Sequence, residues 1–136
     1  MARIPKVVLD TNVIVSALVY GGKPEQIIRL VLSKEIEAVT SPTLLAELSE
    51  VLAKKFNFDQ AKIEQTQKKI KEGFRLIQPR KVLTIVKDEP DNRVLEAADA
   101  AACDSIVTGD KELLELHAFK DIKIITPAEF LTLRPK

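Results

Sequence analysis

Hydrophobic residues along the chain fall into two alternating patterns. Short apolar runs rich in β-branched residues predict strands, and stretches with hydrophobic residues at three- and four-residue spacing predict helices with one buried face. The predicted strands cover residues 4–9, 36–40, 82–86, 105–108 and 122–126. The predicted helices cover residues 13–20, 24–32, 59–77, 94–102, 111–116 and 127–133, together with a helix that begins at Pro42. Strands and helices therefore alternate along almost the whole chain.

Helix boundaries are marked by capping residues and glycines. Ser41 precedes Pro42 and Thr126 precedes Pro127, so in each pair a hydroxyl can cap the first turn that the proline occupies. The glycines at 21–22 separate the first two helices. This alternation favours the α/β class, as an α/β/α domain with a central parallel sheet of four to five strands and helices on both faces. We expect a single domain over residues 1–136.

Composition narrows the functional classes. The chain of 136 residues is 46% hydrophobic, but its apolar runs are far shorter than the roughly 20 residues of a membrane-spanning helix, and we expect a cytoplasmic protein. One cysteine and one histidine exclude an internal disulfide and the spacing of a structural zinc site. The net charge of +1 lacks the strong positive charge of a constitutive nucleic-acid binder. Any catalytic chemistry must therefore rely mainly on oxygen ligands.

Aspartates follow three of the predicted strands. Asp10 comes directly after the first strand, Asp110 follows the strand at 105–108, and Asp91 lies in the predicted turn DEPDN after the strand at 82–86. Ligands of a parallel sheet gather at the carboxyl ends of its strands. We therefore expect the three aspartates to share one edge of the sheet.

A fourth acid comes from the helix that begins at Pro42. Glu47 lies about 100° around that helix from its hydrophobic stripe, where it can border a cleft, whereas Glu50 lies about 160° away and should face water. Asp88 precedes Asp91 in the same predicted turn. Asp88 or Glu50 can therefore take the place of Asp91 or Glu47 in a site.

Each acid also has an alternative structural role. An aspartate before a helix is a favoured N-cap, which would account for Asp91 and Asp110, and a helical glutamate is usually solvated. Capping accounts less well for Asp10, because Thr11 or Asn12 can cap the same helix. Four carboxylates at one edge would raise one another's pKa unless a cation neutralised them. A hard ion such as Mg²⁺ or Mn²⁺ suits such a set of oxygen ligands.

Four stretches of the sequence carry a resemblance to a known family. They are VVLDTNVIVSAL, SPTLLAEL, DEPDNRVLEAA and IVTGDKELLEL, and an ITPAEFL tail follows them. In this order they resemble the successive acidic motifs of the PIN domain, over about residues 7–116. The chain is most similar to the small prokaryotic PIN proteins grouped with the VapC toxins of toxin–antitoxin systems.

The resemblance implies a metal-dependent endoribonuclease that hydrolyses RNA phosphodiester bonds with Mg²⁺ or Mn²⁺. It further implies a homodimer and, for a toxin, a protein antitoxin that covers the site. The residues that match the family's catalytic and metal-binding acids are Asp10, Glu47, Asp91 and Asp110, and those that match its supporting polar positions are Asn12 and Thr108.

Two other functions fit parts of the sequence. A phosphatase with an aspartate nucleophile also has an apolar strand followed by an aspartate, but it has a second aspartate where this chain has Asn12. Its phosphate-contacting lysine would be Lys111. A non-catalytic PIN-like module would instead hold RNA or a protein without cutting it. The candidate phosphate contacts, which are more commonly solvated charges, are Lys54, Lys55, Arg80 and Lys81.

Overall fold

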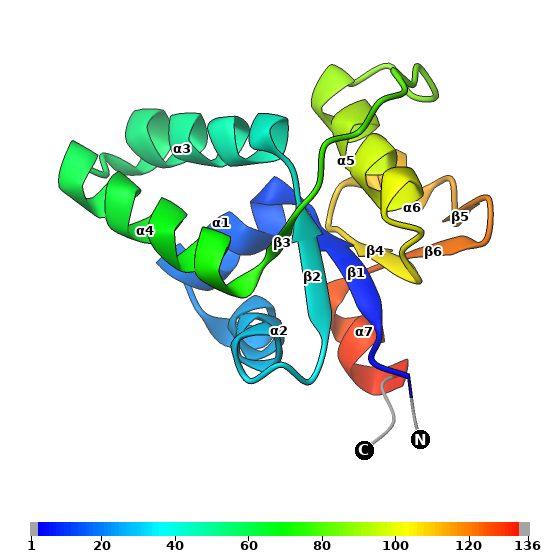
Figure 1. The fold of residues 1–136 in the computed structure, drawn as a ribbon, viewed down its shortest axis with the longest axis horizontal. Helices are drawn as coiled ribbons and strands as arrows, with labels where there is room; N and C mark the ends of the chain where they lie inside the picture. Colours follow the sequence, from blue (N-terminus) through cyan, green and yellow to red (C-terminus); the bar gives the residue numbers. More distant parts are fainter. Residues whose placement is uncertain (1–2, 134–136) are drawn as a thin grey trace.

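The computed structural model describes residues 3–133, which form a sheet with helices on both faces (Figure 1). In chain order its elements are β1 (Lys6–Leu9), α1 (Thr11–Val19), α2 (Gly22–Leu32), β2 (Glu37–Thr40), α3 (Pro42–Phe56), α4 (Gln60–Gly73), β3 (Arg75–Leu76), α5 (Glu89–Ala100), β4 (Ser105–Val107), α6 (Lys111–Leu114), β5 (Ala118–Phe119), β6 (Ile122–Ile125) and α7 (Pro127–Leu133).

The sheet confirms the predicted α/β class. Its strand order is β3-β2-β1-β4-β6-β5, and every pairing is parallel except that of β5 with β6. The sheet has six strands rather than four to five, because two two-residue strands, β3 and β5, extend its edges. The central strands β1 and β4 are neighbours in parallel, so their carboxyl ends meet at the same edge.

The two faces of the sheet are covered by different helices. Val7 and Leu9 of β1 belong to one core, which contains side chains of α1, α2, α3, α4 and α7. Val8, which points to the other face, belongs to a second core with side chains of α5 and α6. Each buried side chain of this size stabilises the fold by about 1.5 to 3 kcal/mol. Burial on both faces therefore fixes the register of β1, and with it the place of Asp10.

The prediction of a strand at residues 82–86 is wrong. Residues 77–88, which we name the strap, contain no helix or strand and run alongside α5. The backbone amides of Leu83, Ile85 and Val86 donate to side chains of α5 rather than to a neighbouring strand. The position next to β2 is instead occupied by β3, which pairs with Val39 and Thr40.

Several helix boundaries differ from the prediction, and two of them differ by more than two residues. The helix expected at 59–77 ends at Gly73, because the chain turns there into β3. The predicted turn DEPDN is not a turn after a strand: α5 begins at Glu89, with Pro90 in its first turn, and not at Val94. Asp91 is therefore a helical residue. No helix of the described part of the chain is long and apolar enough to cross a membrane.

Candidate active site at the carboxyl edge of the sheet

A cleft of about 600 Å³ opens where the chain leaves the carboxyl ends of β1 and β4. One wall comes from α3 and the other from the start of α5, and these two helices stand on either side of the strand ends in Figure 1. Six acidic residues line the cleft: Asp10, Glu47, Glu50, Asp88, Asp91 and Asp110. The topology thus brings all four predicted acids to one place, together with both of the alternatives.

Asp10 is joined to the end of β4 by a threonine. It occupies the N-cap position of α1 without a capping hydrogen bond from its side chain, and it is only 4% exposed. The buried Thr108 hydroxyl donates to Asp10 Oδ2 at 2.7 Å and accepts from the backbone amide of Asp110 at 2.9 Å. Thr108 therefore fixes the positions of two of the acids relative to each other.

Asp110 caps a helix and also faces the other acids. Its Oδ1 accepts from the backbone amides of Glu112 and Leu113 at 2.8 and 3.1 Å, as expected of an N-cap. Its carboxylate also contributes an oxygen to a group with Asp88 and Asp91, in which the three oxygens all lie within 4.8 Å of one another. The capping role and the place in the cluster are therefore compatible.

Asp91 is the acid with the least compensation. It is 4% exposed, and its Oδ2 atom is buried without a hydrogen-bond partner. Burial, followed by the nearby charges of Asp110, Asp88 and Asp10, raises the pKa of Asp91 to about 8. An orphaned buried carboxylate oxygen costs free energy unless a proton or a cation occupies the space beside it.

Asp10 is likewise a buried carboxylate with a raised pKa. Burial raises its pKa, the charges of Glu47 and Asp110 raise it further, and the hydroxyl of Thr108 opposes them. Two like charges about 5 Å apart, such as the ionised carboxylates of Asp91 and Asp110, repel by about 3 kcal/mol at an effective dielectric constant of 20. A divalent cation among these oxygens would remove that repulsion, so the residues present fit Mg²⁺ or Mn²⁺.

The remaining predicted residues differ in how far they enter the cleft. Glu47 is half-buried and near enough to Asp10 to affect its pKa. Glu50 is exposed, as predicted, but it also lines the outer cleft and accepts from Lys54 at 2.9 Å. Asp88 is exposed within the acidic cluster, and Asn12 is an exposed part of the cleft lining.

Asn92 does not line the cleft but supports the segment beside it, and the sequence interpretation missed this role. It is fully buried beside Asp91, its Oδ1 accepts from the amides of Ile85 and Val86, and its Nδ2 donates to the carbonyl of Val86 at 2.8 Å. These bonds hold the strap against α5 just before Asp88. No sequence signal distinguishes Asn92 from an ordinary turn residue, because its partners are backbone groups of an irregular segment.

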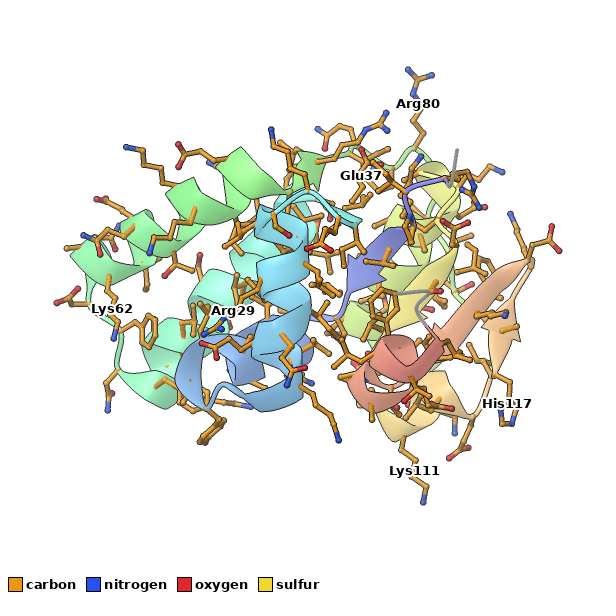
Figure 2. All side chains as sticks on the ribbon, turned by 90° about the horizontal axis from the view of Figure 1, so that it is seen from below. Arg29, Glu37, Lys62, Arg80, Lys111 and His117 are labelled. Atoms are coloured by element: carbon orange, nitrogen blue, oxygen red, sulfur yellow. The ribbon has the colours of Figure 1, made fainter. Side chains whose placement is uncertain are left out.

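Other reactive or charged residues lie outside the cleft. Arg80 and Lys111 extend from the surface in Figure 2, and neither lines the cleft. Lys111 is therefore not placed to contact a phosphate beside Asp10. The Cys103 thiol is buried, and its burial raises its pKa to about 12, which leaves it unreactive.

A larger hollow, of about 720 Å³, lies at the opposite edge of the sheet, near the amino ends of β1, β4 and β6. Two of its three acids have cationic partners, because Asp104 pairs with Arg3 and Asp99 accepts from Lys120 at 2.7 Å, and the third, Asp121, is exposed to solvent. Because the two paired charges are already neutralised and the third is solvated, this hollow offers no comparable place for a cation.

Comparisons with known proteins agree with this architecture. The family profile described as PIN domain matches residues 6–112. The uncharacterized protein MJ1680 of Methanocaldococcus jannaschii is 30% identical, over 93% of this chain and 89% of that protein.

Two crystal structures have a similar fold. One is VapBC2 from Rickettsia felis bound to a DNA fragment from its promoter, with a TM-score of 0.63 and 14% identity over 88% of this chain and 96% of that one. The other is FitAcB from Neisseria gonorrhoeae, with a TM-score of 0.56 and 14% identity over 90% of this chain and 98% of that one. Together with the match of the family profile over residues 6–112, the fold and the acidic cleft lead to one conclusion: this chain belongs to the PIN domain family.

Proposed function

We propose that this protein is a metal-dependent endoribonuclease that hydrolyses RNA phosphodiester bonds, and that it is the toxin of a toxin–antitoxin pair. The observation that carries the proposal is the set of uncompensated carboxylates in the cleft, above all the orphaned Oδ2 of Asp91. Stable folds do not normally bury such groups without a ligand. A cation-dependent reaction explains why this chain does.

Each residue of the site has a defined role in the proposal. Asp10, Asp91 and Asp110 hold the cation, Mg²⁺ or Mn²⁺, Glu47 completes the set from α3, and the exposed Asp88 adds negative charge beside Asp91 and Asp110. When bound, the divalent ion lowers the pKa of a water molecule and offsets negative charge on the phosphate. Thr108 keeps the Asp10 carboxylate in position, and Asn12 lines the cleft beside it.

The toxin assignment rests on likeness. The motifs resemble those of VapC toxins, and the fold is similar to that of VapBC2. The proposal therefore includes a protein antitoxin that covers the cleft, a homodimer, and a cytoplasmic location with the RNA substrate. No specific observation supports either alternative function. Lys111, the phosphate-contacting lysine expected of a phosphatase, does not line the cleft. A purely binding module is disfavoured because six acids in a cleft repel RNA in the absence of a cation.

Cleavage of a mixed RNA substrate tests the proposal. We expect the purified protein to cut RNA in Mg²⁺ or Mn²⁺, to stop when EDTA is added, and to lose cutting in Asp10→Asn. The absence of cutting with every divalent ion tried, or full activity in Asp10→Asn, would contradict the proposal.

A further inference from the structure

The wall formed by α3 changes its charge along the length of the cleft. At the inner end Glu47 lies near Asp10, and at the outer end Lys54 and Lys55 line the same cleft. Seven residues separate Glu47 from Lys54, so Lys54 lies within about 20° of the same helix face and about 10 Å farther along the axis. The cleft therefore runs from an acidic end to a basic end.

These two lysines are the cationic residues of the cleft. Among the described residues that line it, no arginine, histidine or other lysine is present, and none is aromatic. An RNA strand in a cleft with six acids is repelled by them, so the part of the strand that does not contact the cation needs positive charge on the protein. The lack of aromatic side chains leaves no platform for base stacking, which favours contacts to phosphates over contacts to bases.

We propose that Lys54 and Lys55 form a phosphate-binding subsite that holds the RNA strand about two helical turns of α3 away from the acidic cluster. Lys55 forms no ion pair with an acidic side chain in the part of the chain that the structure describes, whereas Lys54 donates to Glu50 at 2.9 Å in an exposed pair. Such an exposed pair contributes little to stability, so a phosphate can replace Glu50 as the partner of Lys54. The inference rests on the proposed function, because that function supplies RNA as the substrate.

Both lysines also lie in the last turn of α3, where basic residues stabilise any helix. Helix α2 offers a matched control for that purely structural role. Arg29 lies in its last turn and forms an exposed i,i+4 pair with Glu25, as Lys54 does with Glu50. Neither Arg29, labelled on α2 in Figure 2, nor the exposed Lys23 lines the cleft.

The test compares two double variants that remove the same charge. We expect Lys54→Gln/Lys55→Gln to raise the KM for RNA about five- to twenty-fold with kcat nearly unchanged, and to reduce the slope of log(kcat/KM) against log[salt] by about 0.7 for each lost contact. Lys23→Gln/Arg29→Gln should leave both quantities at the wild-type level. Glu50→Gln should lower KM, because it frees Lys54 and removes one negative charge.

Binding without cleavage separates this inference from the proposed function. Fluorescence anisotropy of a short labelled single-stranded RNA, in the Asp10→Asn background with Mg²⁺, measures affinity whether or not the protein cuts. Weaker binding of the lysine variant but not of the control supports the subsite, even if the wild type proves unable to cut RNA. Cutting by the wild type, with equal affinity and equal KM in both double variants, would overturn the subsite and leave the ribonuclease proposal intact.

Discussion

Acidic residues at the two edges of the sheet have pKa values that are shifted in opposite directions. At the amino edge, Asp104 is half-buried, and although this burial opposes the effect, the Arg3 guanidinium and the Lys6 backbone amide hold its pKa below the usual value. At the carboxyl edge, burial and neighbouring acids raise the pKa of both Asp10 and Asp91. At the amino edge, Asp104 and Asp99 therefore pair with the basic side chains of Arg3 and Lys120.

This difference separates the candidate site from the other large cavity of the fold. The volume of a cavity does not identify the candidate site, since the larger hollow lies at the amino edge. The surroundings of the acids do distinguish the two edges, because among the described residues a cluster of three acids within 4.8 Å of one another lies at the carboxyl edge. The comparison predicts that substitutions at the two edges will have separate effects on activity and on stability.

The largest expected effect comes from exchanging one aspartate for asparagine at each edge. Asp91→Asn should reduce RNA cleavage in Mg²⁺ by about 100-fold or more, because the amide neither neutralises a cation nor replaces the lost carboxylate. Asp104→Asn should retain cleavage while losing stability, because the Arg3 guanidinium loses its anionic partner. Initial rates and thermal midpoints of both variants measure the two effects. Equal loss of activity in both would remove the distinction between the edges.

A smaller effect is expected for the residue that links Asp10 to Asp110. Thr108→Val removes the hydroxyl but keeps the shape, and we expect cleavage and Mg²⁺ affinity to fall by about ten-fold, with Thr108→Ser restoring most of the loss. Ser105→Ala, at the opposite end of β4 and beside the amino-edge hollow, is the matched control and should stay active. Wild-type activity in Thr108→Val would show that Asp10 needs no positioning.

The smallest effect concerns stability without metal. The folded-state pKa of Asp91 is raised from 3.8 to about 8, so its protonated form favours the fold below pH 3.8, and this contribution is lost as the pH rises toward 8. We expect the midpoint of thermal unfolding in EDTA to fall by about 3 to 8 °C over this range. Mg²⁺ should reverse most of the fall near pH 8.

Two variants identify the source of that pH dependence. Asp91→Asn should make the curve less steep, because it removes one of the two acids, with Asp10, whose pKa is raised. Asp104 acts with the opposite sign, because its lowered pKa gives stability that is present above pH 3.8 and lost as the pH falls through the folded-state pKa. Asp104→Asn should therefore lower the midpoint by a constant amount above pH 3.8 and remove this part of the loss on the acidic side. A midpoint in EDTA that rises between pH 4 and 8 would contradict the assignment for Asp91.

The periodicity of the sequence predicted most of the fold but not the segment before α5. Continuous apolar runs such as β1 are buried on both faces, so their pattern alone indicates a central strand. The run at 82–86 has the same composition, yet it forms the strap, because Asn92 and Glu96 of α5 supply partners for its backbone amides. A side chain that satisfies a backbone group from another element leaves no local signal in the sequence.

The sequence by itself determined that Asp10 and Asp110 follow buried strands, and the order of its motifs indicated the PIN domain. Local patterning is sufficient for this, since strand burial and helix capping depend on near neighbours. Only the tertiary structure decided that Asp88 joins Asp91 and Asp110, that Thr108 bridges Asp10 to β4, and that Lys54 and Lys55 share their cleft. These contacts join residues that are far apart in the sequence, and the packing of α3 and α5 against the sheet sets the distances between them.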